Sequence, residues 1–309
     1  MKVLICYFSG TGNTEKVAYK FASCFTELNN EVETVAVESV LDGKTLKDSF
    51  ITQLKEADLV GFGYPIHAFN APAIVLEFAK RIPRLAEKKR AFVFNTSGEP
   101  LELNNVSSIK LRRMLKLRNV EVTSEYHYCM PYNIMFRHSD DMACKMWTTA
   151  EQLIPLDVKD LAENKPHLLK KVFCGGFVAW VMRCEHWGGR LNGRKYKVSD
   201  ECAHCEKCIN ICPTHNISIV DGKFKFGRKC LMCMRCAMLC PKNAIKIGWF
   251  NKWKVNGAYS FDTPATDEEQ QHYNKMLTKA YDKYFAECDE RIAHIESNRQ
   301  SSQDGQVNQ

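Results

Sequence analysis

Eight cysteines lie between residues 202 and 240, and their spacing limits what this segment can fold around. They form two runs of the pattern Cys-x2-Cys-x2-Cys-x3-Cys-Pro, and the second run repeats the first 28 residues later. Three cysteines so spaced on a curling loop can reach three corners of an iron–sulfur cube, whereas the fourth points at the neighbouring cluster. We therefore predict two [4Fe-4S] clusters with crossed ligands. The first is held by Cys202, Cys205, Cys208 and Cys240, and the second by Cys230, Cys233, Cys236 and Cys212.

Structural zinc is the alternative for these cysteines, because Cys-x2-Cys pairs about 15–20 residues apart are typical of zinc ribbons. Zinc needs only four ligands per site, which leaves the third cysteine of each run and both Cys-Pro pairs unexplained. At these residues, segment 199–248 resembles bacterial two-cluster ferredoxins, with Ile217 and Ile245 in equivalent places of the two halves. The resemblance implies a pseudo-twofold fold of short hairpins and helices.

The first 160 residues alternate strand-like and helix-like segments, a pattern that indicates a parallel sheet covered by helices on both faces. Apolar runs predict strands at residues 3–8, 31–37, 57–63, 90–95 and 120–128. Helical periodicity predicts helices at residues 13–28, 71–82 and 106–117. We therefore expect an α/β, doubly wound, five-stranded parallel sheet.

A Gly- and hydroxyl-rich loop follows the first predicted strand directly and leads into a helix. Its residues are Ser9, Gly10, Thr11, Gly12, Asn13 and Thr14. Hydroxyls and backbone N–H groups that converge on a helix N-terminus bind phosphate. The loop lacks the Gly-Lys-Ser/Thr of nucleoside-triphosphate loops, and Glu15 replaces the third glycine of the dinucleotide pattern, so a monophosphate fits best. The stretch resembles the flavodoxin signature, which implies FMN; the alternative is a plain turn.

The loops after the third and fourth strands are the expected site of the flavin ring, since open parallel sheets bind ligands at the carboxyl ends of their strands. The resemblance to flavodoxins implies the same two loops. The candidate residues are Tyr64, Pro65 and Phe69 in one loop and Thr96, Ser97 and Gly98 in the other. Tyr64 or Phe69 would stack on the ring, and residues 96–98 would bond its polar edge. The alternative is that both aromatics only pack the loop, and we expect His67 to be a surface residue.

Four segments follow from these patterns. They are a flavodoxin-like FMN-binding domain (1–160), a helical linker (161–198), a two-[4Fe-4S] ferredoxin domain (199–250), and a C-terminal amphipathic helix with a disordered polar tail (251–309). The proline- and lysine-rich stretch 155–171 marks the first boundary, and a capping box at 266–269 starts the C-terminal helix. Together with residues 195–198, the motifs resemble the EFR-type ferredoxin family, in which a flavodoxin-like domain is fused to a two-cluster ferredoxin.

The seven other cysteines are expected to be small buried hydrophobes. Cys174, Cys184 and His186 would need a fourth ligand to form a metal site, and the local sequence offers none. The aromatic cluster of the linker is expected to pack between the domains, with a partner surface as the alternative. Its members are Phe173, Phe177, Trp180 and Trp187.

Charge and cysteine usage bound the cellular setting. The formal charge of +7 is offset by roughly −2 for each oxidised cluster with its thiolates and about −2 for a flavin phosphate, so nucleic acid is not indicated as a partner. Fifteen cysteines, an odd number, without a recognisable signal peptide predict reduced thiols and a cytoplasmic location. No apolar run approaches the roughly 20 residues of a membrane-spanning helix.

These features lead to the hypothesis of an electron-transfer iron–sulfur flavoprotein that passes single electrons between its clusters and FMN. Because no second dinucleotide motif is visible, the expected partners are redox proteins, either a ferredoxin-type carrier or an oxidoreductase. The alternative is an FMN-dependent reductase of a small acceptor such as a quinone or nitro compound, fed by its own clusters. A sensor that reports oxygen or iron would need an effector module, which the sequence does not show.

Overall fold

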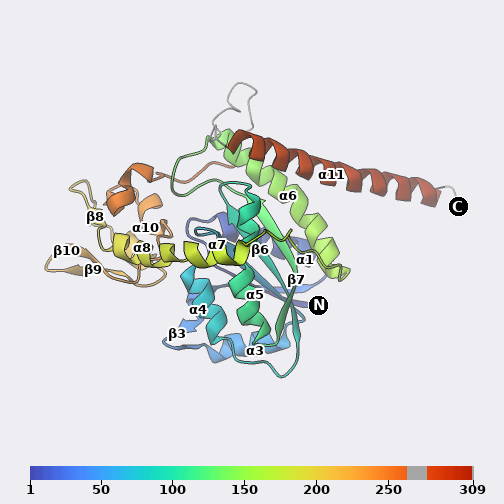
Figure 1. Ribbon diagram of the computed structural model, residues 1–309, viewed down its shortest axis with the longest axis horizontal. Coiled ribbons are helices and arrows are strands. Elements are labelled where there is room, and N and C mark those ends of the chain that lie inside the picture. The colour runs from blue at the N-terminus through green and yellow to red at the C-terminus, as the bar shows by residue number, and fades with distance from the viewer. Residues whose placement is uncertain (263–276, 308–309) are drawn as a thin grey trace.

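The computed structural model describes residues 1–262 and 277–307, and its N-terminal part is built on a five-stranded parallel sheet (Figure 1). The strands are β1 (Lys2–Tyr7), β2 (Glu31–Ala36), β5 (Leu59–Pro65), β6 (Lys89–Ser97) and β7 (Val120–Cys129). They lie in the order β2-β1-β5-β6-β7, and every neighbouring pair is parallel. This is the flavodoxin-like order of a doubly wound sheet. The five predicted strands are confirmed to within a few residues at their ends.

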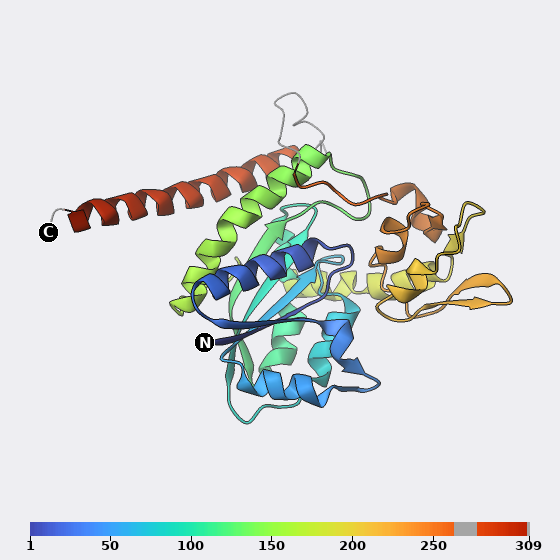
Figure 2. The same ribbon diagram turned by 180° about the vertical axis from the view of Figure 1, so that it is seen from behind.

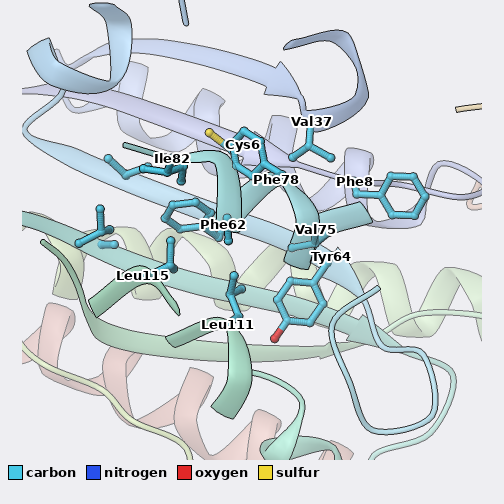
Figure 3. Close-up of a cluster of buried hydrophobic side chains, with 14 of the residues drawn as sticks. Cys6, Phe8, Val37, Phe62, Tyr64, Val75, Phe78, Ile82, Leu111 and Leu115 are labelled. Atoms are coloured by element: carbon cyan, nitrogen blue, oxygen red, sulfur yellow. The ribbon is translucent and has the colours of Figure 1, made fainter. Parts of the chain in front are cut away.

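Both faces of the sheet are covered by helices because alternate residues of its central strands are apolar on both sides. Leu4, Cys6 and Phe8 lie in one core cluster, whereas Val3, Ile5 and Tyr7 lie in the other. The first cluster, part of which is drawn in Figure 3, packs under α3 (Asp48–Glu56), α4 (Ala73–Arg81) and α5 (Ile109–Lys116). The second packs under α1 (Asn13–Glu27) and α6 (Asp140–Ala162).

Several elements were not expected from the sequence. They are α2 (Val37–Val40), the hairpin of β3 (Leu41–Asp42) and β4 (Thr45–Leu46), α3, the 3-10 turn η1 (Glu102–Val106), and α6. The expected boundary at residues 155–171 is wrong at its start, because Pro155 lies inside α6. Leu153, Ile154 and Val158 are buried on either side of that proline, and their packing offsets the hydrogen bond that proline cannot donate.

The cysteine-rich part repeats its own backbone. Its elements are β8 (Lys197–Val198), α9 (Lys207–Asn210), β9 (Ile217–Val220), β10 (Lys223–Phe226), α10 (Arg235–Met238), β11 (Ile245–Lys246) and η2 (Gly248–Trp253). Strand β9 pairs antiparallel with β10, and β8 pairs antiparallel with β11. The left-handed residues His204 and Glu206 recur 28 positions later as Met232 and Met234, and α10 follows α9 at the same spacing. The repeat in the sequence is therefore also a repeat in the structure.

Helices α7 (Gly175–Met182) and α8 (Cys184–Gly193) lie end to end in both views (Figures 1 and 2). The expectation that the linker aromatics pack between the domains is wrong. Phe173 is 94% exposed and Trp187 is 69% exposed. Small residues make the close contacts instead: a Cβ at Gly175 would lie 2.5 Å from Val106, and one at Gly193 would lie 2.1 Å from Cys230.

The C-terminal helix α11 (Thr278–Val307) packs back on the N-terminal part of the molecule (Figure 1). Tyr281 and Phe285 are buried with Met142 and Met146 of α6. The predicted amphipathic helix is confirmed from Thr278 onward, and its predicted start at 266–269 lies outside the described residues. The expectation of disorder beyond residue 296 is wrong up to Val307, because an anchored helix extends at little further cost.

A buried carboxylate joins α6, α11 and the sheet. The Asp157 side chain is 1% exposed, and its Oδ1 lies 2.5 Å from Nη2 of Arg291. The hydroxyl of Tyr128 donates to Asp157 Oδ2 at 2.5 Å. Burial raises the pKa of Asp157, and Arg291 and Tyr128 oppose that rise only in part. Arg291 therefore stabilises the negative charge of the Asp157 carboxylate, which burial in the core disfavours.

We predict that Arg291→Ala lowers the free energy of unfolding by about 2 kcal/mol at pH 8, less than for a fully buried pair because Arg291 is partly exposed. Without Arg291 the pKa of folded Asp157 rises further above its unfolded value. Folding then favours the protonated form, so the loss should shrink as pH falls towards 5. Denaturant unfolding at both pH values measures this.

The control is Arg291→Ala combined with Asp157→Asn, which removes the charge while keeping an acceptor for Tyr128. This double variant should regain most of the stability at pH 8. An equal loss at pH 5 and pH 8 would contradict the electrostatic explanation.

Candidate functional site

A cavity of about 710 Å³ lies at the carboxyl edge of the sheet. The three loops singled out in the sequence meet there. The sequence candidates that line it are Ser9, Gly10, Thr11, Asn13 and Thr14 from the first loop, Pro65 and Phe69 from the second, and Thr96, Ser97 and Gly98 from the third. Of the sequence candidates for this site, only Gly12 and Tyr64 are not part of the lining.

The first loop leads directly into the N-terminus of α1. Gly12 precedes the helix at φ +106°, a conformation that side-chain-bearing residues rarely adopt, and no side chain caps the helix. Ser9 Oγ accepts a hydrogen bond from the Gly12 N–H at 3.1 Å, and the hydroxyls of Thr14 and Thr96 are bonded at 2.8 Å. Thr11 is the loop residue whose hydroxyl makes no hydrogen bond within the described residues. The loop thus presents backbone N–H groups and a free hydroxyl to the cavity.

Tyr64 is placed away from the cavity. Its side chain is fully buried beside Phe62, Val75 and Leu111 (Figure 3), and its hydroxyl lies 3.3 Å from Ser107 Oγ. Its ring therefore packs the core of the sheet, which leaves Phe69 as the aromatic of this loop at the cavity.

Phe69 sits in a strained turn at the cavity wall. Ala68 and Phe69 both have positive φ, and His67 and Asn70 exchange two backbone hydrogen bonds of 2.9 Å across them. Such strain is commonly held at ligand sites. The expectation for His67 is wrong: it is half-buried at the cavity, and burial lowers its pKa to about 4.

Part of the lining was missed by the sequence reasoning. It comes from the loop after β7 and from the linker and cysteine-rich part, and includes Met130, Pro131, Tyr132, Met182, Glu185, Gly189, Met232 and Trp253. The loop after β7 could have been found by extending the strand-end argument to the fifth strand. Tyr132 packs so tightly on Gly98 that a Cβ there would lie 2.3 Å from the ring. The residues of α8 do not follow a strand of the sheet, so the strand-end argument could not have found them.

Glu185 is an unpartnered carboxyl group in the cavity wall. Its Oε2 is buried and makes no hydrogen bond, and burial raises the pKa of this group to about 7. Nε2 of the neighbouring His186 is also buried without a partner. A carboxyl group that titrates near neutral pH in a cavity is suited to proton transfer.

The cysteines gather in the crossed sets. Cys212, Cys230, Cys233 and Cys236 line one small cavity, and Cys202, Cys205, Cys208 and Cys240 line another. Backbone N–H groups donate to sulfur in both: Met232 to Cys230 at 3.4 Å and Asn216 to Cys212 at 3.3 Å in one, and His204 to Cys202 at 3.4 Å and Ala244 to Cys240 at 3.3 Å in the other. Both cavities thus combine four thiols with backbone donors aimed at sulfur.

All fifteen cysteines lie among the described residues, and none of them forms a disulfide. Burial raises the pKa of Cys230 and Cys236, and raises that of Cys233 to about 12. In the part of the chain that the structure describes, no three His, Cys, Asp or Glu side chains converge closely enough to hold a single metal ion. Nor does any helix there have the length and apolarity to cross a membrane.

The second cysteine run packs directly on the first loop. A Cβ at Gly10 would lie 2.3 Å from the carbonyl oxygen of Cys233. Next to it, Arg235 donates to the carbonyl oxygens of Ser9 at 2.5 Å and Gly10 at 3.3 Å, and pairs with Glu38 at 2.7 Å. The cysteine set of residues 212, 230, 233 and 236 is therefore the one beside the main cavity.

Comparison with known proteins finds similarity to solved structures only, since no family model and no curated protein matches the chain. A flavodoxin from Streptococcus pneumonia TIGR4 is 16% identical, with 53% of this chain and 99% of that chain covered and a TM-score of 0.39. Flavodoxin 2 from Bacillus cereus is 16% identical, with 53% of this chain and 99% of that chain covered and a TM-score of 0.38. An FMN-dependent NADH-azoreductase from Bacillus anthracis is 17% identical, with 52% of this chain and 99% of that chain covered and a TM-score of 0.37. Values this low carry no argument about ligand or activity, and the flavodoxin-like fold rests on the strand order.

We predict that Gly10→Ala destabilises the protein by about 1–3 kcal/mol, because its methyl group would overlap the Cys233 backbone. The control is Gly176→Ala in α7, where a Cβ would meet nothing within 4 Å. That change should leave stability unchanged or raise it slightly. Thermal unfolding of both variants measures the difference, and equal melting temperatures would contradict the close contact.

Proposed function

We propose that this protein is an electron-transfer iron–sulfur flavoprotein, in which a ferredoxin-like part with two [4Fe-4S] clusters exchanges single electrons with FMN in the flavodoxin-like part. The observation that carries the proposal is the contact between the second cysteine run and the glycine-rich loop. The cysteine set of residues 212, 230, 233 and 236 meets a phosphate-type loop at one junction, as expected if their cofactors exchange electrons.

The cysteine sets support the clusters by number and grouping. Each set has the four thiolates that a [4Fe-4S] cluster takes, and the grouping follows the crossed ligand pattern. Burial raises the pKa of Cys230 and Cys233, so these two thiols keep their protons at neutral pH until a metal displaces them. The two N–H···S bonds of each set would stabilise the reduced form of its cluster and raise the potential of that cluster.

The main cavity supports FMN through the chemistry of its donors. The first loop offers neutral hydrogen-bond donors and a helix N-terminus, which suit a dianionic monophosphate. Phe69, Thr96 and Ser97 line the same cavity, where the ring would lie. FMN accepts one or two electrons and so connects one-electron to two-electron chemistry. In this proposal, Cys212, Cys230, Cys233 and Cys236 hold the cluster nearer to FMN.

The proposed partners are redox proteins, either a ferredoxin-type carrier or an oxidoreductase, because the sequence has no second dinucleotide motif. Reduction of a small acceptor such as a quinone or nitro compound is the second candidate. The specific observation in its favour is that the cavity extends beyond the three loops to Met182, Gly188 and Trp253, where an acceptor beside the ring would have room.

The test of the clusters is anaerobic purification followed by iron and sulfide analysis. We predict about eight of each per chain, and we predict that Cys240→Ser damages the cluster of Cys202, Cys205 and Cys208 while leaving the other intact. Paramagnetic resonance of the reduced protein resolves the two clusters.

The matched control is Cys174→Ser, because Cys174 is exposed and lies outside both sets. This variant should keep all its iron. Stoichiometric zinc with little sulfide would overturn the cluster proposal, and selective loss of the Cys230 cluster in Cys240→Ser would overturn the crossed ligation.

The test of FMN uses two changes in the first loop. Gly12→Val forces a branched side chain into φ +106° and should abolish FMN binding without loss of iron. Thr11→Ala removes one neutral hydrogen bond, about 0.5–1.5 kcal/mol, and should weaken binding about two- to tenfold. Fluorescence titration of the flavin-free protein measures both. Riboflavin should bind far more weakly than FMN, and equal affinity for the two flavins would show that the loop is only a turn.

A further inference from the structure

A stripe of exposed apolar side chains runs along α7 and α8. Its members are Phe173, Phe177, Trp180, Cys184, Trp187 and Leu191. From Phe177 onward their spacing alternates between three and four residues, which places these side chains on one side of a helical rod, and Phe173 lies two residues before α7. Phe177 is 66% exposed, Trp180 is 65% exposed and Leu191 is 54% exposed. The stripe is therefore continuous over the length of the rod.

The rod formed by α7 and α8 buries its small residues and exposes its large apolar ones, the reverse of an ordinary amphipathic helix. Gly175, Ala179, Gly189 and Gly193 face the protein and are buried, two positions along from members of the stripe. Small residues thus pack inward while the largest apolar side chains point outward. Soluble proteins rarely expose apolar surface of this extent without a binding role.

The exposed charged residues of the segment that carries the stripe are basic. Exposed basic residues flank it at both ends: Lys170, Lys171, Arg190, Arg194, Lys195 and Lys197. Arg190 also lies 5.5 Å from the ring centre of Trp187. Glu185 is the single acidic residue between positions 164 and 199, and it lines the cavity.

This charge pattern decides between the occupants of the stripe. Pairing with a second copy of the chain would bring two sets of basic residues together with no acidic group between them, which is unfavourable. An anionic lipid surface matches both features, because aromatic side chains bury in the headgroup region while basic residues meet lipid phosphates.

We propose that α7 and α8 form a membrane-docking surface that lies along the face of an anionic phospholipid bilayer. Trp180 and Trp187 enter the headgroup region, and the flanking basic residues hold the rod parallel to the surface. Met182 and Cys184 also line the main cavity, so the bilayer would lie beside that cavity. This is peripheral binding and needs no spanning helix.

The test is vesicle flotation of the anaerobically purified full chain. We expect binding to vesicles of phosphatidylcholine with one quarter phosphatidylglycerol, at least tenfold weaker binding to pure phosphatidylcholine, and a decrease as salt rises. The tryptophan emission should shift to the blue on binding. The triple change Phe177→Ser, Trp180→Ser and Trp187→Ser should reduce binding at least tenfold, and so should Lys170→Gln, Lys171→Gln, Arg190→Gln and Arg194→Gln together.

The matched control is Leu28→Ser with Leu117→Ser, two exposed leucines at the amino ends of the strands. It should bind as the wild type does, and circular dichroism and melting temperature verify that all variants fold. Absence of binding to the anionic vesicles would overturn the proposal and favour an acidic protein surface. Sedimentation showing a wild-type dimer and a triple-variant monomer, with no lipid binding, would also overturn it in favour of a second copy.

Discussion

The contact between Gly10 and the Cys233 backbone is the constraint on which the arrangement of the two halves depends. No residue larger than glycine fits there, because the Cβ position lies 2.3 Å from a carbonyl oxygen. Arg235 closes the same junction by donating to Ser9, Gly10 and Ile211, and Glu38 balances its charge. A guanidinium that spans these acceptors fixes orientation as well as distance. One cysteine set is thereby held against the loop at the N-terminus of α1.

The features that could be predicted from the sequence are those encoded in local spacing. The strands follow from short apolar runs, and the grouping of the cysteines follows from three-residue steps and a fourth ligand launched from the next helix. The strands and the three-residue steps are determined by backbone geometry within about ten residues, and the crossing follows from the repeat of the run 28 residues later. The cavity loops could be located for the same reason, since each directly follows a predicted strand.

The direction of a side chain at a strand end depends on the alternation of side chains along that strand. Tyr64 continues the alternation of Val60 and Phe62, which places all three on the same face of β5. Period-two counting therefore already assigns Tyr64 to the core. The contributions of α8 and η2 could not be predicted at all, because their place at the cavity follows from the packing of the cysteine-rich part on the first loop. Residues distant in sequence carry no local signal for such a contact.

Helix α8 connects three parts of the molecule through residues on its different sides. Gly193 lets it approach Cys230, Glu185 faces the cavity, and Trp187 faces outward. The glycines bring the helix close to the cysteine set because they add no side-chain thickness. A helix with its side chains is about 10 Å across, and on its glycine side it is thinner. A bilayer bound on the outer side of α8 would thus be separated from Cys230 by little more than one helix. The same residues that make this rod unusual, small inside and aromatic outside, therefore place the proposed docking surface close to the proposed cofactors.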